Sequence, residues 1–222
     1  GWGQGLIFIA KSDTNYIFSQ RTHSNSALIG ILSSPDYVVT GNVRQDDSGI
    51  IWAVNYGETS AGPLLVAFDK DTNSYGFENC ASPLDRWYLD LAIDQNGTKW
   101  IASTSSGGLL YYNENKTLAD KTDDICGKIN KDNYPNILSN IQTSLAVDKQ
   151  GQLWIGTPNG LSSIFNPNAV LFNQQPFVRS IRQLNQQTVN GIYVDPVDNK
   201  WLATNQGLWL LNSDGSEIIN VF

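Results

Sequence analysis

Apolar residues occur along the chain in short runs of four to seven residues, separated by polar turns rich in Asp, Asn, Gly and Ser. The runs contain Val, Ile, Leu, Trp, Tyr and Phe, which favour strands, and no window shows the 3.6-residue period of an amphipathic helix. The pattern predicts an all-β protein built from antiparallel hairpins. Near the end of the chain we expect strands at about 189–195, 200–204, 207–212 and 217–222.

Four tryptophans mark an internal repeat. They are 48, 54 and 47 residues apart, and an aspartate precedes each of them by six positions. Three copies have a glycine three positions before the tryptophan, where the fourth copy has Asp198, and a Gly-Leu pair follows in most copies. Repeats of about 50 residues with four strands each are typical of β-propeller blades. The repeat-defining pairs are Asp46 and Trp52, Asp94 and Trp100, Asp148 and Trp154, and Asp195 and Trp201.

The repeat sets the expected domain organisation. Two strands, at about 6–10 and 16–20, precede the first full copy, and Gly5-Leu6 matches the start of a third strand. We therefore expect 1–222 to be a single β-propeller segment of four-stranded antiparallel blades, with about four and a half blades present, as a fragment of a larger propeller. The predicted units are a half-blade at 1–37 and full blades at 38–84, 85–140, 141–184 and 185–222.

Composition and charge exclude several functions. The net charge is 14 − 21 = −7, whereas a surface that binds nucleic-acid phosphates needs clustered Lys and Arg. No run of 18 apolar residues is present, so we expect no transmembrane segment, and the N-terminal residues do not resemble a signal peptide. Hydrophobic residues make up 41% of the chain, which indicates a folded domain.

The two cysteines lie at similar places in neighbouring copies. Cys80 follows Trp52 by 28 residues, and Cys126 follows Trp100 by 26 residues, which places both near outer strands. Blades fan apart at the rim, so we expect the two Cα atoms to be further apart than the roughly 7 Å that a disulfide tolerates. Free thiols are therefore predicted.

The repeated residues favour structural roles. An aspartate in a hairpin caps backbone amides of its turn, and four equivalent copies favour this role over a catalytic one. Tryptophans at one repeat position are expected to pack between blades. Three tryptophans lie outside this register and are better ligand candidates, although we expect them to pack as well; they are Trp2, Trp87 and Trp209.

Two further segments are candidates for chemistry. The single histidine, His23, lies in a polar loop without a Gly-x-Ser-x-Gly motif, so we expect a surface loop residue. Residues 69–73 begin like a calcium loop, but Ser74 and Cys80 stand where such a loop has Gly and Glu, which favours a hairpin turn. We predict no catalytic residues, no cofactor site and no metal site.

Two segments carry a resemblance to known families. Residues 148–161 match Asp-x-x-Gly-x-x-Trp-(Ile/Leu)-(Gly/Ala)-Thr-x-x-Gly-Leu, which resembles the two-component-regulator propeller repeat. Residues 187–219 contain Asn199-Lys200-Trp201 in a hairpin and lead into Ser213-Asp214-Gly215, which resembles the PorZ-like propellers of the type IX secretion system of Bacteroidetes. Asn55 departs from the repeat at its threonine position.

The resemblance implies a non-enzymatic binding or assembly module, exported to the cell surface or periplasm, associated with the outer membrane and linked to type IX protein secretion. The implied partners are cell-envelope proteins, with lipopolysaccharide or a glycan as alternatives. An anionic lipopolysaccharide would need a local basic patch, for which Arg179, Arg182 and Lys200 are the nearest candidates, so we favour protein contacts. Two alternatives are a glycan-sensing ectodomain of a hybrid two-component receptor and a carbohydrate-active enzyme with paired carboxylates.

Overall fold

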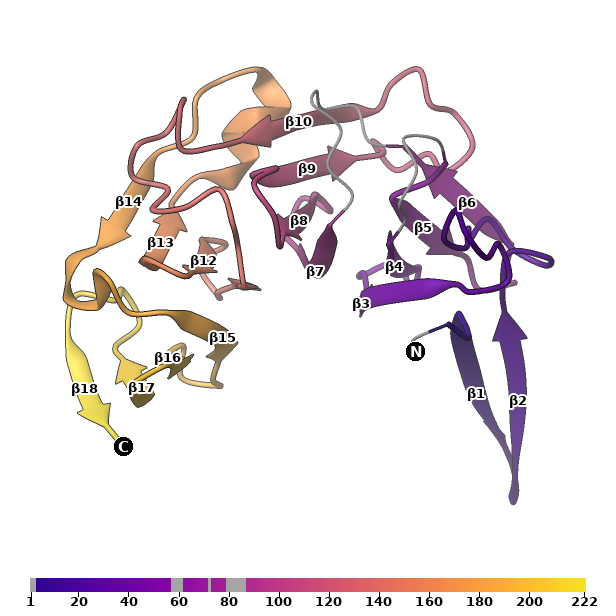
Figure 1. Ribbon diagram of the computed structural model, residues 1–222, viewed down its shortest axis with the longest axis horizontal. Coiled ribbons are helices and arrows are strands. Elements are labelled where there is room, and N and C mark those ends of the chain that lie inside the picture. The colour runs from indigo at the N-terminus through magenta and orange to yellow at the C-terminus, as the bar shows by residue number, and fades with distance from the viewer. Residues whose placement is uncertain (1–2, 57–61, 72, 79–86) are drawn as a thin grey trace. The chain divides into compact units, whose positions relative to one another are not determined.

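The structure is a computed structural model that describes residues 3–56, 62–71, 73–78 and 87–222. The chain forms two compact units, residues 1–89 and 90–222. The strands assemble into one two-stranded sheet and four four-stranded sheets (Figure 1). Within each sheet, strands that are consecutive in the sequence are neighbours. A four-stranded antiparallel meander is the blade of a β-propeller, so the predicted fold class is confirmed.

The first part of the chain forms a hairpin and one blade. The aromatic ring of Phe8, in the hairpin, packs edge-on against the ring of Phe68, in the blade, with 5.3 Å between the ring centroids. Leu28, Val38 and Ala53 are buried in the same apolar cluster. The strands are β1 (Leu6–Ser12) and β2 (Asn15–Arg21) in the hairpin, and β3 (Val39–Gln45), β4 (Ile51–Tyr56), β5 (Leu65–Phe68) and β6 (Ser74–Phe77) in the blade.

Three further blades follow, and two short 3₁₀ helices lie beside the outer strands. They are β7 (Tyr88–Ile93), β8 (Lys99–Ser103), β9 (Leu109–Asn113) and β10 (Ile125–Ile129); β11 (Ser144–Val147), β12 (Leu153–Thr157), β13 (Gly160–Ile164) and β14 (Val178–Ile181); and β15 (Val189–Val194), β16 (Lys200–Thr204), β17 (Gly207–Leu211) and β18 (Ile218–Val221), with η1 (Pro167–Phe172) and η2 (Arg182–Leu184). The four complete sheets lie within the ranges 38–84, 85–140, 141–184 and 185–222.

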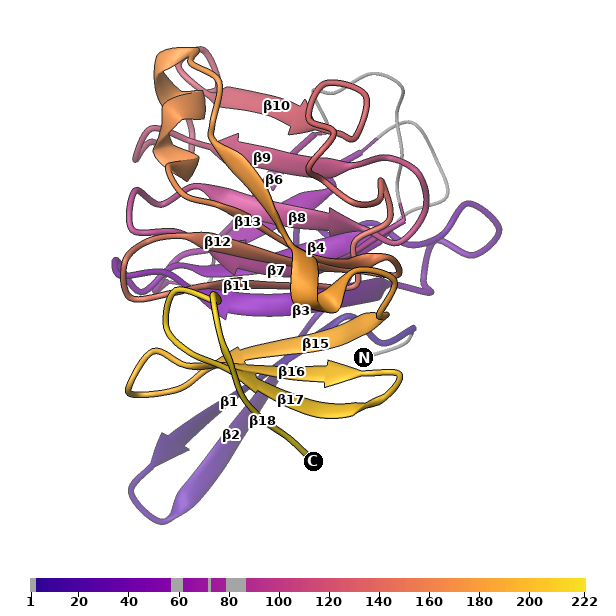
Figure 2. The same cartoon turned by 90° about the vertical axis from the view of Figure 1, so that its left-hand side faces the viewer.

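Apolar side chains form the core between neighbouring sheets of residues 90–222. Trp100 and Leu109 of the β7–β10 sheet share a buried cluster with Leu153 and Ile155 of β12. Trp154 and Leu161 of the next sheet share a second cluster with residues of β15–β18. Figure 2 shows the β15–β18 sheet next to the β11–β14 sheet. The β11–β14 sheet therefore has an apolar contact on both faces, as expected where blades stack face to face.

Hydrogen bonds also join the first strands of neighbouring blades. A carboxylate oxygen of Asp90, Oδ2, accepts from the backbone N–H of Leu145 at 2.7 Å. Ser144, at the equivalent position of the next blade, accepts from the N–H of Ile192 at 3.0 Å through its hydroxyl. In these two blades, the side chain four residues before the repeat aspartate thus accepts a hydrogen bond from the backbone of the following blade. In the last blade this position is Gly191.

The departure at Asn55 has a local explanation. Thr157 and Thr204 each donate from Oγ1 to a glycine carbonyl three residues on, at 2.9 Å, which closes the turn between the second and third strands. The buried Asn55 instead binds the preceding segment, where its amide accepts from the N–H of Ile29 at 2.7 Å and donates to the Ile29 carbonyl at 3.0 Å. A longer side chain with both a donor and an acceptor therefore holds the chain that enters the blade.

The prediction of free thiols is wrong for Cys126, which is disulfide-bonded. Cys126 lies in the outer strand β10, opposite Tyr112, as the spacing predicted. The prediction assumed that both cysteines are fixed at separated outer strands. Cys80, which lies outside the described residues, follows the last residue of β6 by three positions, so strand spacing does not set its distance from β10.

We expect Cys126 to resist alkylation in unfolded protein that has not been reduced, because a disulfide sulfur is not a nucleophile. Mass spectrometry after iodoacetamide treatment should show labelling only when a reductant is added first. A labelled Cys126 peptide from unreduced protein would contradict the disulfide.

Candidate functional site

Each repeat aspartate accepts a hydrogen bond from the tryptophan six residues later. In all four copies the indole Nε1–H donates to Oδ2 of the carboxylate. This bond joins the hairpin turn to the second strand, and it explains why the spacing of six is constant. The N–O distances are 2.8 Å for Asp46 and Trp52, 2.9 Å for Asp94 and Trp100, 2.7 Å for Asp148 and Trp154, and 3.0 Å for Asp195 and Trp201.

The other carboxylate oxygen closes the turn. Oδ1 of Asp148 accepts from the backbone N–H groups of Gln150 and Gln152 at 3.0 and 2.8 Å, and the other three copies make the same two bonds. The bond two residues on matches the capping expected from the sequence, whereas sequence reasoning missed the indole bond. Both oxygens are thus engaged inside the repeat, which leaves these carboxylates poorly placed to exchange protons with a substrate.

The carboxylate of Asp195 stays ionised at lower pH than an ordinary aspartate. Desolvation raises its pKa, but hydrogen bonds from the Trp201 indole and from the amides of Asn199 and Val197 more than compensate and hold the pKa below its usual value.

The repeat position three residues before the tryptophan, which Asp198 occupies in the last copy, has a left-handed backbone in all four copies. Gly49, Gly97 and Gly151 have φ angles of 83°, 76° and 79°, and Asp198 has 71°. Aspartate tolerates this conformation better than most residues because its short polar side chain can bond locally. Here the Asp198 Oδ1 accepts from the N–H of Lys149 in the preceding blade at 3.0 Å.

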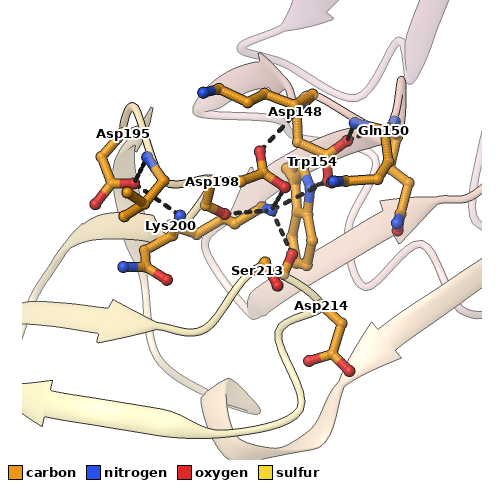
Figure 3. A network of polar contacts seen from close by, with 12 residues as sticks. Asp148, Gln150, Trp154, Asp195, Asp198, Lys200, Ser213 and Asp214 are labelled. Carbon is orange, nitrogen blue, oxygen red and sulfur yellow. Dashed lines mark hydrogen bonds and ion pairs between the residues drawn. The ribbon is translucent and has the colours of Figure 1, made fainter.

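Lys200 lies at the centre of a buried polar cluster between two blades (Figure 3). Its ammonium Nζ is 3.1 Å from Oδ2 of Asp148 and 3.2 Å from Oδ2 of Asp198, and all three side chains are almost fully buried. It also donates to the backbone carbonyls of Asp198, at 2.7 Å, and of Ser213. The ring of Trp154 lies 4.9 Å from Nζ, within cation–π distance. One lysine therefore joins the last blade to the Asp–Trp pair of the preceding one.

Arg179, Arg182 and Lys200, the nearest candidates for the basic patch that lipopolysaccharide would need, do not form one exposed patch. Lys200 is buried against two carboxylates, so it presents no charge to solvent. Arg179 lies 4.4 Å from the ring of Phe165 and donates to the carbonyl of Asp214. Burial lowers the pKa of the Arg179 guanidinium, although nearby carboxylates oppose the shift. Arg182 alone of the three is exposed.

Lysine occupies the same repeat position in another copy. Lys99 precedes Trp100 as Lys200 precedes Trp201, and it forms an ion pair with Glu114 in which both side chains are buried. In the intervening copy this position is Leu153, which is buried in the apolar core. The position before the repeat tryptophan therefore faces the interior, and a lysine there brings a carboxylate partner with it.

The tryptophans differ in their exposure. Trp52, Trp100 and Trp154 are fully buried in second strands. Trp201 also lies in a second strand but is partly exposed and stacks on Phe222 at 5.8 Å between ring centroids. Outside the register, Trp87 is 56% exposed and packs edge-on against Tyr56, while Trp209 packs against the last apolar cluster. Trp2 lies outside the described residues.

His23 has the surroundings of a surface residue. Its Nδ1 lies 3.4 Å from Oδ1 of Asp36, whose side chain is 93% exposed, whereas the carboxylate of a catalytic triad is buried. The adjacent Ser24 hydroxyl shares a hydrogen bond with Thr22 at 2.9 Å rather than with the imidazole. The histidine therefore lacks an activated nucleophile beside it.

The segment that begins like a calcium loop forms a turn between β5 and β6. Oδ1 of Asp69 accepts from the N–H groups of Asp71 and Asn73, each at 2.9 Å. Among the residues that the structure describes, no group of three or more His, Cys, Asp and Glu side chains is placed to hold a metal ion. No helix in the described parts of the chain is long and apolar enough to cross a membrane.

Comparison with known families agrees with the repeat geometry. Residues 137–159, which include Asp148 and Trp154, match the sequence profile described as the two component regulator propeller. The chain carries this propeller repeat. No curated protein matches the whole sequence significantly.

Solved structures share the propeller fold at low sequence identity. PorZ of Porphyromonas gingivalis, described as an essential bacterial surface component of the type IX secretion system, aligns with 100% of this chain and 31% of its own, with a TM-score of 0.78 and 22% identity. A protein of B. thetaiotaomicron, described as the extracellular domain of a hybrid two-component system, aligns with 89% of this chain and 25% of its own (0.58, 20%). A catalytically inactive variant of virginiamycin B lyase from Staphylococcus aureus aligns with 82% of this chain and 54% of its own (0.59, 12%).

This chain spans less than two thirds of the length of each of these three proteins. They include a secretion component, a receptor ectodomain and an enzyme, so the shared fold does not select among these functions.

Proposed function

We propose that the chain is a non-enzymatic, protein-binding segment of an exported β-propeller that serves type IX protein secretion at the bacterial cell surface. The observation that carries the proposal is the alignment of the entire chain with PorZ, a surface component of that system. The Asn199-Lys200-Trp201 hairpin that suggested this family also provides the buried lysine of the last blade.

Among the described residues, the candidate carboxylates and the histidine are arranged for structural roles. The four repeat carboxylates are bound to their own turns and indoles, and the glycosidase arrangement of two differently placed carboxylates in one cleft finds no counterpart among them. His23 pairs with an exposed carboxylate in a loop. These groups support the fold and the turns rather than a reaction.

A protein partner fits the charge distribution better than lipopolysaccharide. The chain carries a net charge of −7, which repels anionic headgroups. Two of the three candidate basic side chains are held by the protein, Lys200 by Asp148 and Asp198, and Arg179 by Phe165 and the Asp214 carbonyl. Of the three, Arg182 is exposed. Protein surfaces impose no such requirement.

The proposal is tested by immobilising the purified chain and measuring binding to purified outer-membrane components of a type IX system, with lipopolysaccharide micelles and oligosaccharides in parallel. We expect saturable binding to a protein component that survives 0.5 M salt only in part, as for a mixed polar interface, and no binding of lipopolysaccharide.

Two results would contradict the proposal. Specific binding of an oligosaccharide without any protein component would favour the receptor ectodomain, for which the exposed Trp87 would be the first residue to mutate. Turnover of an ester or glycoside substrate that is lost in His23→Ala would show an enzyme.

A further inference from the structure

The connection between β13 and β14 exposes three phenylalanines and carries no charged residue. It covers residues 165–177 and includes η1, whereas the shorter segment 212–217 makes the equivalent connection in the last blade. Phe165 is 38%, Phe172 68% and Phe177 63% exposed. Single exposed apolar side chains are common on protein surfaces, but neighbouring exposed rings on a long connection indicate a contact surface.

Two of these rings lie on the same face of the blade as a cation. Ser163 and Arg179 are paired across β13 and β14, and Phe165 and Phe177 lie two residues further along the two strands. Side chains two residues apart on a strand point to the same face, so all four side chains share one face of the sheet. The backbone N–H of Phe165 donates to the carbonyl of Phe177 at 3.1 Å, which continues the pairing.

These side chains form a chain of ring and cation contacts that begins at Trp154. The guanidinium carbon of Arg179 lies 5.6 Å from the ring centroid of Trp154 and 4.4 Å from that of Phe165. The ring centroids of Phe165 and Phe177 are 5.6 Å apart. We call Trp154, Arg179, Phe165 and Phe177 the aromatic row. Its exposure increases from the fully buried Trp154 to Phe177.

The two ends of the aromatic row differ. At the Trp154 end the last blade covers the ring, because Lys200 Nζ lies 4.9 Å from it and Gly215 lies so close that an added Cβ would be 2.5 Å away. At the Phe177 end the ring is largely exposed. A ligand that adds to the row therefore has access to Phe177 and to the exposed part of Phe165.

A turn of the last blade places negative charge beside the aromatic row. The Arg179 guanidinium donates to the backbone carbonyl of Asp214, which lies in the turn at residues 212–217. Asp214 and Glu217 in this turn are both exposed. Hydrogen bonds from the hydroxyl and the backbone N–H of Ser216 hold the pKa of the Asp214 carboxyl below its usual value, so this carboxylate is ionised at neutral pH.

We propose that Phe165 and Phe177 form a docking surface for an arginine side chain of a protein partner. A guanidinium is weakly hydrated and stacks on the electron-rich face of an aromatic ring, and Phe165 already contacts Arg179 in this way. A second guanidinium on Phe177 continues the alternation of rings and cations. The exposed carboxylates of the 212–217 turn and the net charge of −7 attract it.

The inference rests on the protein-binding function proposed above and assigns to it a surface and a chemical class of partner residue. Arginine is enriched in protein interfaces, which suits this role. Exposed phenylalanines also insert into membranes, but the charge that attracts an arginine repels anionic lipids.

The test uses the full chain with ¹³C-labelled phenylalanine rings and a synthetic probe, the peptide acetyl-Gly-Arg-Gly-Arg-Gly-amide. A matched peptide has citrulline in place of arginine, which keeps the planar end group but removes the charge. Ring signals are followed by ¹H–¹³C NMR during titration. We expect the arginine peptide to shift the signals of Phe165 and Phe177 saturably, and the citrulline peptide to bind about fivefold more weakly or less.

Two variants locate the binding surface. Phe177→Leu removes the ring but keeps an apolar side chain, and it should weaken binding of the arginine peptide about two- to fivefold. Phe172→Leu is the matched control, since it changes a similarly exposed ring of the same connection, and its affinity should equal that of the unchanged chain. Thermal unfolding checks that both variants are folded. The proposal is overturned if Phe177→Leu binds as well as the unchanged chain, or if the two peptides bind equally well.

The same variants separate this inference from the proposed function. A type IX outer-membrane protein that binds the unchanged chain and Phe177→Leu equally would overturn the docking surface and leave the proposed function intact. Binding of the arginine peptide at the two rings, without binding of any such protein, would support the surface and contradict the proposed function. Binding to phosphatidylglycerol vesicles that is lost in Phe177→Leu would overturn the inference, because the occupant would then be a membrane.

Discussion

Lys200→Met is expected to destabilise the protein by about 3–5 kcal/mol, because it removes the ammonium group that lies between two buried carboxylates. Oδ2 of Asp148 and Oδ2 of Asp198 both lie within 3.2 Å of Nζ and have little access to solvent. Methionine keeps most of the aliphatic stem against Trp154. The loss of unfolding free energy therefore reports the removal of the charge rather than a change in side-chain volume. Urea unfolding followed by tryptophan fluorescence and circular dichroism gives the free energy.

The repeat offers a control and a rescue for this prediction. Leu153→Met alters the same position in a blade where it packs in an apolar core, and volume-conserving changes there cost less than about 1.5 kcal/mol. Adding Asp198→Gly to Lys200→Met removes one of the stranded carboxylates and restores the glycine of the other three copies, so stability should partly return. A Lys200→Met protein as stable as the Leu153→Met protein would show that the buried cluster contributes no net stability.

The sequence predicts the fold well because the repeat is defined by local chemistry. The spacing of six between Asp148 and Trp154 encodes a turn whose bonds all lie within seven residues, so each copy can be recognised without its neighbours. The strands expected at 200–204 and 207–212 differ from the observed β16 and β17 by at most one residue. Hairpins pair residues that are close in the sequence, which makes their register a local property.

The features that sequence reasoning missed depend on contacts between blades. Lys200 looked like a surface charge, yet strand alternation places it on the face of Leu202, which is buried against the preceding blade. A signal was present, because Asp198 replaces the glycine of the other copies two residues before Lys200. The positions of Asp148, Asp198 and Lys200 in the sequence do not tell how far apart their side chains lie across the interface between two blades. The structure shows that the three side chains are in contact.

The prediction about Cys126 was wrong for a related reason. The spacing from Trp100 places Cys126 correctly in an outer strand, which is a local result. Whether an outer strand can form a disulfide depends on long connections between strands, whose paths have no repeated pattern. Irregular segments such as these are where a sequence repeat carries the least information.

Trp154→Ala is expected to cost about 3–5 kcal/mol, as for other fully buried aromatic side chains, and Trp201→Ala less than about half of that. Truncation of Trp154 opens a cavity beneath Gly215, removes the indole donor to Asp148 and takes the aromatic face from Lys200. Trp201 makes the same indole bond to Asp195, but its ring is partly exposed and stacks on Phe222.

The comparison of the two variants separates the repeat position from its surroundings, because both tryptophans lie in the second strand and bind an aspartate in the same way. Equal losses in urea unfolding would show that the indole–carboxylate bond, rather than burial between blades, gives the position its stability. A larger loss for Trp154→Ala would show that full burial of the ring, which Trp201 lacks, gives the position most of its stability.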